Sequence, residues 1–175
     1  MENSGEENRI LKENGPSKTL CFTGHRVISK GDMDELARLL DEVIENAISD
    51  GFCVFLSGGA LGFDTASAFR VLAAKAEFPD IKLILVLPCR NQSEKWKNQR
   101  DLLEYQMLKD NADDIIYTSE QYEKGCMHKR NRFMVDNSGR VISYLIQKRS
   151  GSAYTAKYAE KKGVECVSLA DLMGK

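Results

Sequence analysis

Short runs of apolar residues alternate with longer amphipathic segments along most of this chain. Each run is too short to form a helix in its position, and such runs are typical of buried strands. We therefore predict six strands, at residues 20–22, 52–56, 81–87, 114–117, 141–146 and 165–168.

The segments between these strands show the three- and four-residue spacing of amphipathic helices. Between the first two strands, apolar residues recur in this way from Met33 to Ala47. Asp32 and Glu35 predict a capping pair at the start of that helix, and Gly51 predicts its end. Similar patterns predict helices over residues 64–76, 93–111, 127–137 and 152–162.

The repeated order of strand and helix predicts an α/β protein with a Rossmann-like three-layer fold. In such folds a mostly parallel sheet is covered by helices on both faces. The 175 residues suit one domain. Residues 1–18 are polar and include Gly15 and Pro16, so we expect a disordered N-terminal tail followed by a single domain over residues 19–175.

The charge balance bears on the choice of partner. With 25 basic and 26 acidic residues the net charge is -1, so no overall attraction to nucleic acid or to an acidic membrane is expected. The first residues are polar and no apolar run is long enough to span a bilayer, which predicts a cytoplasmic protein. The five cysteines are scattered without a CxxC pair, so we expect neither a disulfide framework nor a metal site.

Glycine, basic and amide residues cluster directly after four of the predicted strands. In an open parallel sheet, ligands bind outside the carboxyl ends of the strands. The loops concerned are residues 23–26, 57–64, 88–92 and 148–152. We therefore predict one binding site, built by these four loops at one edge of the sheet.

The loop Gly58-Gly59-x-x-Gly62 leads straight into a predicted helix. Its backbone amides and the positive end of the helix dipole would suit a phosphate, although a tight turn also needs glycines. The loop matches neither the dinucleotide-binding fingerprint nor the P-loop. A second glycine-serine loop at residues 150–152 favours binding. Asp64, in the first helical turn, either caps the helix or contacts ribose hydroxyls.

Three other residues each have two interpretations. His25 and Arg26 follow a strand, where a cationic pair suits an anionic ligand but a solvated loop has the same composition. His25 shows no evident partner for a general-base role. Trp96, the single tryptophan, lies in a polar segment and either covers a base or anchors its helix on the sheet. Met127 is assigned to the core.

Five ordered motifs resemble the YpsA-like family of the SLOG superfamily over residues 19–170. They are TGHR at 23–26, SGGALGFD at 57–64, PxxNQxxKW at 88–96, RNxxMVDxS at 130–138 and SGSAYTAxYA at 150–159. The resemblance implies a Rossmann-like fold and a role in sensing or processing nucleotide-derived ligands such as ADP-ribose-like molecules. By analogy with the superfamily, we also expect a homodimer.

Two related groups of proteins frame the choice of activity. The LOG phosphoribohydrolases carry a helix similar to residues 127–134, with Arg130 on their arginine, but Thr155 stands where their catalytic glutamate would be. A hydroxyl cannot supply that negative charge, so hydrolysis would need Asp64 or Asp136 instead. The DNA-processing protein DprA carries a loop similar to residues 57–64 and binds single-stranded DNA, but here Leu61 replaces an arginine.

The sequence thus supports three hypotheses. The first is binding or sensing of a nucleotide or nucleotide-derived small molecule, with Arg26 and Arg130 neutralising its phosphate and no cofactor required. The second is N-glycosidic hydrolysis, with Arg130, Asp64 and Asp136 as catalytic candidates. The third is single-stranded DNA binding, although the charge balance argues against nucleic acid and membranes as partners. The residues predicted to contact the ligand are Gly24, His25, Arg26, Ser57, Gly58, Gly59, Ala60, Gly62, Asp64, Pro88, Asn91, Gln92, Trp96, Arg130, Asn131, Ser150, Gly151, Ser152 and Thr155.

Overall fold

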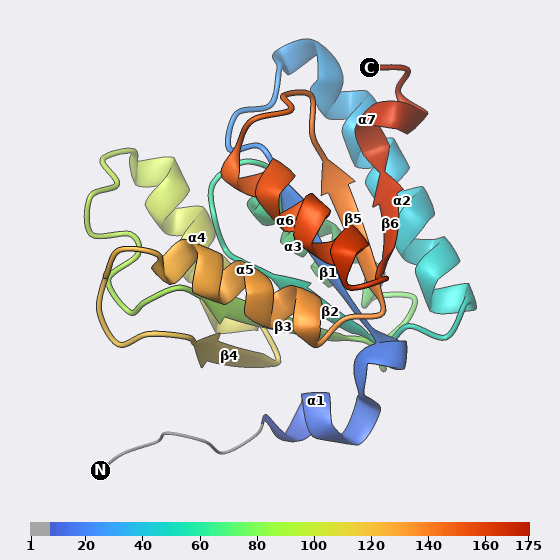
Figure 1. The fold of residues 1–175 in the computed structure, drawn as a ribbon, viewed down its shortest axis with the longest axis horizontal. Coiled ribbons are helices and arrows are strands. Elements are labelled where there is room, and N and C mark those ends of the chain that lie inside the picture. The colour runs from blue at the N-terminus through green and yellow to red at the C-terminus, as the bar shows by residue number, and fades with distance from the viewer. Residues whose placement is uncertain (1–7) are drawn as a thin grey trace.

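Six parallel strands form one sheet in the order β4-β3-β2-β1-β5-β6 (Figure 1). The computed structural model describes residues 8–175. All six runs that were predicted as strands form strands. They are β1 (Thr19–Gly24), β2 (Val54–Ser57), β3 (Lys82–Leu87), β4 (Asp114–Tyr117), β5 (Arg140–Tyr144) and β6 (Glu165–Ser168).

Seven α-helices and two short 3-10 turns connect and flank these strands within the described residues. The five predicted helices are all present, with shifts at their ends. The helices are α1 (Arg9–Asn14), α2 (Met33–Ser49), α3 (Phe63–Ala74), α4 (Gln99–Asn111), α5 (Cys126–Asp136), α6 (Gly151–Lys161) and α7 (Leu169–Leu172), and the turns are η1 (Pro16–Lys18) and η2 (Lys30–Asp32).

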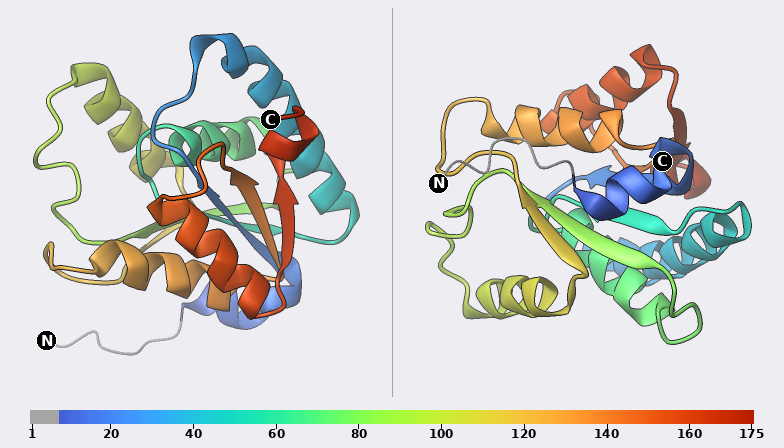
Figure 2. Two further views of the ribbon diagram at one scale, coloured as in Figure 1. Left: turned by 45° about the horizontal axis from the view of Figure 1, so that its top comes forward. Right: turned by 90° about the horizontal axis from the view of Figure 1, so that it is seen from below.

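The helices cover both faces of the sheet, as predicted for a Rossmann-like fold (Figure 2). Side chains alternate between the faces along each strand. In β1, for example, Leu20 and Phe22 join the core shared with α2, α3, α4 and α7, whereas Cys21 joins the core shared with α1, α5 and α6. Both faces of the central strands β1, β2, β3 and β5 are therefore largely buried, which explains why these strands have continuous apolar sequences. Within residues 8–175, no helix is long and apolar enough to cross a membrane.

The predicted tail over residues 1–18 is wrong for its second half. Residues 9–18 form α1 and η1, and Leu11 is buried in the core beneath α5 and α6. Asn8 caps α1 by accepting a hydrogen bond from the Leu11 amide, and it donates one to Asp114 at 2.7 Å. Leu11, the partly buried Ile10 and the Asn8 cap together dock this short helix. Residues 1–7 lie outside the described residues.

The predicted capping pair at the start of α2 is also wrong. Asp32 makes no capping hydrogen bond. Its carboxylate instead accepts hydrogen bonds from the Tyr144 hydroxyl at 3.0 Å and from the Lys175 ammonium, because η2 directs it toward the sheet. The predicted end of the helix is confirmed, since Gly51 follows it in a left-handed conformation with φ of 98°.

The strand order reverses next to β1. The chain runs from β1 through β2 and β3 to β4 in one direction, and β5 and β6 lie on the other side of β1. The neighbouring strands β1 and β5 therefore lead to helices on opposite faces of the sheet, α2 and α6, and the loops that follow these two strands separate at their carboxyl ends. Such a reversal opens the crevice in which open α/β sheets bind ligands.

Candidate functional site

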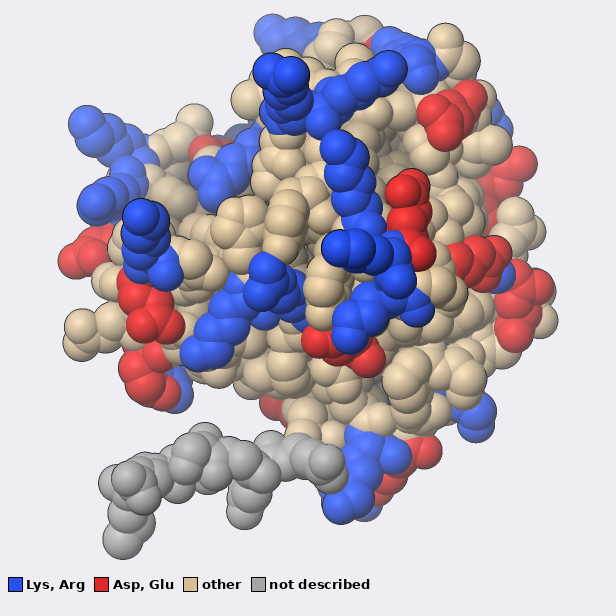
Figure 3. Space-filling view, in the orientation of Figure 1, with Lys and Arg blue, Asp and Glu red and all other residues tan. Residues whose placement is uncertain are grey.

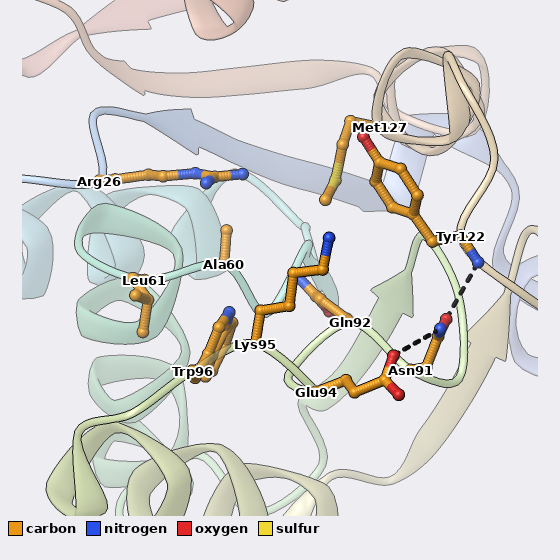
Figure 4. A pocket seen from close by; sticks show the side chains of 10 residues that line it. All are labelled: Arg26, Ala60, Leu61, Asn91, Gln92, Glu94, Lys95, Trp96, Tyr122 and Met127. Atoms are coloured by element: carbon orange, nitrogen blue, oxygen red, sulfur yellow. Dashed lines mark hydrogen bonds between the residues drawn. The ribbon is translucent and has the colours of Figure 1, made fainter.

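Two adjoining pockets lie at the carboxyl edge of the sheet. The first, called the inner pocket here, has a volume of about 300 Å³; the second, called the outer pocket, has about 490 Å³. The inner pocket is lined by Thr23, Gly24, His25, Arg26, Ala60, Asp64, Met127, Arg130, Asn131, Ser150, Gly151 and Ser152. The outer pocket is lined by Arg26, Ala60, Leu61, Asn91, Gln92, Glu94, Lys95, Trp96, Tyr122 and Met127 (Figure 4). Arg26, Ala60 and Met127 belong to both and mark their junction.

The four predicted loops do meet at this edge, but not every residue predicted in them reaches a pocket. Most of the predicted contact residues line the inner or outer pocket. Six others line neither pocket: Ser57, Gly58, Gly59, Gly62, Pro88 and Thr155.

The glycines of the loop after β2 meet packing and turn requirements. Gly59 and Gly62 have positive φ values of 62° and 80°, which favour glycine. A side chain at Gly62 would overlap the backbone carbonyl of Arg26, and one at Gly59 would approach Leu87 to 2.6 Å. Gly58 makes room for a guanidinium, because a Cβ there would overlap Arg130. Turn geometry at Gly59 and Gly62 and packing at Gly58 therefore account for these three glycines without a phosphate.

Arg130 is buried beside the inner pocket, with 4% of its surface exposed. Its guanidinium donates hydrogen bonds to the carbonyl of Gly58 and, at 2.6 Å, to the side-chain oxygen of Asn131. Burial lowers its pKa, and the neighbouring Asp64 opposes that shift. Because these donors are occupied by the protein, Arg130 holds the loop after β2 against α5.

Asp64 also borders the inner pocket and is almost fully buried. Burial raises the pKa of its carboxyl group to about 6, although Arg130, the Ala60 amide and Arg26 all favour the ionised form. Its backbone carbonyl accepts a hydrogen bond from the Ser57 hydroxyl at 2.9 Å. Asp64 is thus a carboxyl group beside a cavity, and its pKa lies closer to neutrality than that of an ordinary aspartate.

A chain of hydrogen bonds joins α5 to the start of α6. The Asn131 amide donates to the Thr155 hydroxyl at 2.9 Å, and that hydroxyl donates to the Gly151 carbonyl at 3.0 Å. Ser152 then donates to the Gly24 carbonyl at 2.7 Å, which ties α6 to the end of β1. Thr155 therefore fixes the position of Asn131 and, through it, of Arg130.

His25 holds the loop that follows β5. Its Nε2 accepts hydrogen bonds from the amides of Ile146 and Gln147, at 2.7 and 3.0 Å. These contacts also explain why β5 ends at Tyr144 rather than at the predicted Ile146: the Ile146 amide bonds to His25 instead of a neighbouring strand. Burial lowers the pKa of His25, which favours the neutral imidazole that these hydrogen bonds require.

The outer pocket is built by a loop that was predicted to be helical. The predicted helix over 93–111 starts only at Gln99, because Asn98 caps it by accepting from the amides of Arg100 and Asp101. The preceding residues stay in an irregular loop against the pocket. Within that loop, Asn91 accepts from the Tyr122 amide at 3.0 Å, so it joins two pocket walls.

Trp96 packs against the core and also lines the outer pocket. It packs against the core and makes an edge-on contact with Tyr105 of α4, with the ring centroids 5.0 Å apart. This confirms the anchoring interpretation. The same side chain also lines the outer pocket (Figure 4), which leaves stacking on a base as a proposal.

Asp136 does not belong to this site. It lies at the far end of α5, where its carboxylate accepts a hydrogen bond from Tyr158 at 2.9 Å and pairs with Lys162 at 3.5 Å. It lines neither of the two pockets. Of the two carboxylates considered from the sequence, only Asp64 reaches the inner pocket.

Six pocket residues were not among the predicted contacts. Met127 was assigned to the core, yet it is only partly buried and forms the wall between the two pockets. Its position three residues before Arg130 on a helix was the available signal. The others are Thr23, Leu61, Glu94, Lys95 and Tyr122. Among residues 8–175, no cluster of three or more His, Cys, Asp or Glu side chains is placed to hold a metal ion.

Comparisons with known proteins agree with this architecture. The family model YpsA, described as the YspA SLOG family, matches residues 22–168. The prophage-derived protein YoqJ of Bacillus subtilis is 29% identical over 142 residues, covering 73% of this chain and 80% of its own. A UPF0398 protein of Brevibacillus brevis is 30% identical over 142 residues, covering 79% and 71%.

Two solved structures have the same fold. DNA processing protein A of Helicobacter pylori, described with a single-stranded DNA binding mode, superposes with a TM-score of 0.64 at 23% identity. The superposition covers 92% of this chain and 68% of the Helicobacter pylori chain. DprA of Streptococcus pneumoniae superposes with a TM-score of 0.62 at 22% identity, over 91% of this chain and 51% of its own. The likeness confirms the Rossmann-like class.

Proposed function

The chain belongs to the YspA SLOG family, and from that premise we propose that it binds a nucleotide or nucleotide-derived small molecule in the joined inner and outer pockets. The observation that carries this proposal is the position of the pockets at the strand-order reversal beside β1, where the loops of four elements converge. The inner pocket offers hydroxyl, amide and carboxyl groups. The outer pocket offers the aromatic rings of Trp96 and Tyr122.

The single tryptophan gives a direct test. Because Trp96 lines the outer pocket, its intrinsic fluorescence reports on binding there. We expect titration with AMP, ADP, NAD or ADP-ribose to change that fluorescence and to raise the melting temperature, since a ligand of the folded state stabilises it. Asn131→Asp should weaken the effect, whereas Asp136→Asn, outside both pockets, should not. A flat response to all four compounds contradicts the proposal.

Catalysis is a separate question within the same site. Thr155 is engaged with Asn131 and Gly151, so hydrolysis of an N-glycosidic bond would depend on Asp64. A carboxyl group with a pKa of about 6 can act as a general acid near neutral pH. Release of free base from any bound nucleotide, and its loss in Asp64→Asn, would establish the hydrolytic alternative.

A second candidate function, binding of single-stranded nucleic acid, is favoured by the charge distribution. Basic side chains gather over α5 and α6 on the face seen in Figure 3. Exposed lysines and arginines on these helices, in the loop before α6 and at its C-cap outnumber the acidic residues Asp136 and Glu160; they are Lys129, Arg132, Lys148, Arg149, Lys157, Lys161 and Lys162. The net charge of -1 conceals this local excess, and the similar structure of Helicobacter pylori is described as binding single-stranded DNA.

An oligonucleotide titration at low and at physiological salt separates the two candidates. If this basic face binds nucleic acid, the logarithm of the affinity should fall steeply with the logarithm of salt concentration. The double variant Lys157→Glu, Lys161→Glu should abolish that binding and leave the nucleotide response of Trp96 intact. Absence of any mobility shift at low salt removes the second candidate.

A further inference from the structure

Two of the five cysteines, Cys89 and Cys126, lie in contact although they are far apart in the sequence. Cys89 belongs to the loop that follows β3, and Cys126 is the first residue of α5. Both are free thiols and almost fully buried, with 0% and 1% of their surfaces exposed. The Cys126 thiol lies within hydrogen-bonding reach of the Cys89 thiol. Neither residue lines the inner or the outer pocket.

The packing of α5 against β3 brings the two thiols together. α5 joins two strands of a parallel sheet, β4 and β5, so it runs in the opposite direction to β3. The Arg130 guanidinium approaches the Val86 carbonyl, near the end of β3, at 3.4 Å. Cys126 lies one helical turn before Arg130 on the same face of α5, about 6 Å nearer the carboxyl edge of the sheet. Cys89 lies beyond Val86 in that same direction, so the contact follows from the way these two elements pack.

The two loops that carry the thiols are fastened together at the surface. The Arg90 amide donates to the Glu120 carbonyl at 3.2 Å, and the two side chains form an ion pair at 2.7 Å. Both side chains of this pair are more than half exposed, and exposed ion pairs add little stability. Residues 120–125 are all exposed and irregular. This segment can therefore open locally, and admit a reagent to Cys126, while the sheet stays folded.

We propose that Cys89 and Cys126 form a reversible disulfide when the protein meets a low-molecular-weight disulfide. Cys126 reacts first, because it directly follows the exposed segment. Its thiolate attacks one sulfur of the reagent, breaks the reagent's S–S bond and releases the other half as a thiolate. The Cys89 thiolate then attacks the Cys126 sulfur of this mixed disulfide and releases the second half. The protein pair loses two electrons and two protons, and the reagent is reduced to two thiols.

Cys89 suits the second of these steps. Burial and the neighbouring Cys126 raise the pKa of its thiol. A thiol with a raised pKa is a weak nucleophile toward reagents in solution, so it attacks a sulfur that is already held against it. The new bond would connect the loop that carries Trp96 to the helix that carries Met127, and these residues line the outer pocket. Oxidation would thereby join two walls of that pocket covalently.

The test exposes the reduced chain to buffers of increasing ratio of oxidised to reduced glutathione, alkylates the remaining thiols, and then unfolds and digests the protein with trypsin. Cleavage after lysine and arginine leaves the two cysteines in separate peptides, residues 83–90 and 125–129. We expect mass spectrometry to find these peptides joined, and separated again after treatment with dithiothreitol. Because the fold already holds the thiols in contact, the joined form should appear at a ratio about tenfold or more lower than in urea.

A cysteine variant separates the two steps. In Cys89→Ser, which lacks the second thiol, Cys126 should stop at the mixed disulfide with glutathione. Cys166→Ser is the matched control, because Cys166 is exposed on β6 and its loss should leave the joined peptides unchanged. Alkylation of both Cys89 and Cys126 in the folded protein, at every ratio that joins them in urea, would overturn the proposal, as would mixed disulfides alone in the wild type. No nucleotide enters this experiment, so its outcome is independent of the proposed function.

Discussion

At the scale of single residues, the pocket contains groups that are held at a cost to stability. Asp64 is the clearest example, because burial raises its pKa to about 6 even though the positive charge of Arg130 favours the ionised form. The unfolded chain releases this proton near 3.8, the ordinary value, whereas the folded state keeps it to about pH 6. Since the folded pKa is raised, stability is fullest below the unfolded value and is lost as the pH rises through about 6.

Asp64→Asn is therefore expected to stabilise the protein at pH 7.5. The asparagine resembles the neutral acid, and two pKa units correspond to roughly 3 kcal/mol in the free energy of unfolding, taken as an upper bound. Urea unfolding at pH 7.5 and at pH 4 measures the difference, which should nearly vanish at the lower pH. Asp110→Asn, an exposed carboxylate on α4, serves as the control. A destabilised Asp64→Asn variant at pH 7.5 would contradict the assignment.

Gly59 represents the opposite case, a residue required by the backbone. Alanine there combines a φ of 62° with a 2.6 Å approach to Leu87, so Gly59→Ala should cost about 2 kcal/mol or more. Gly151→Ala is the contrast, because Gly151 begins α6 and its Cβ would enter open space. Thermal melting of the two variants checks this. Equal melting temperatures of the two variants would show that the loop adjusts to a side chain at residue 59, so that the turn itself does not require glycine there.

At the scale of elements, His25 couples the end of β1 to the loop between β5 and α6. Its neutral Nε2 accepts two amide hydrogen bonds, and protonation would convert this acceptor into a donor. Burial depresses the folded pKa of His25 below its ordinary value of 6.5. The contribution to stability is therefore present above pH 6.5 and is lost as the pH falls from there toward the folded pKa.

His25→Phe should release the loop at neutral pH. We expect the amides of Ile146 and Gln147 to lose hydrogen-exchange protection, with a loss of roughly 1–2 kcal/mol for two neutral hydrogen bonds. His128→Phe, on the exposed face of α5, replaces the chain's other histidine and should leave those amides protected. Persistent protection in His25→Phe would show that other contacts hold the loop.

At the scale of the whole molecule, periodicity predicted what depends on burial and missed what depends on single contacts. The six strands and α2 to α6 follow from apolar spacing, because each buries a face against a common sheet. The loop before α4 was missed because Asn98 caps the start of α4 within a segment whose uniform polarity gives no sign of the boundary. Half of the outer pocket's lining was missed with it, since residues such as Lys95 and Tyr122 meet only after folding.

The amino edge of the sheet contributes to stability, whereas the carboxyl edge carries the pockets. α1 docks at the amino ends of the strands, through Leu11, the 2.7 Å hydrogen bond between Asn8 and Asp114, and a contact from the Cys53 thiol to Asn14. The pockets lie at the carboxyl ends. A chain that begins at Gly15 should therefore melt at a lower temperature, because it exposes the core that Leu11 covers.

That shortened chain should still give an unchanged Trp96 response to whichever nucleotide the full chain binds. A free tail would predict no change in melting temperature, so an unaltered melt would contradict the docked helix. Leu11→Ala, compared with Lys12→Ala on the solvent side of α1, separates the apolar contact from the loss of chain length. If ligand affinity fell along with stability, the two edges would be coupled through the strands, and the amino edge would be part of the binding mechanism.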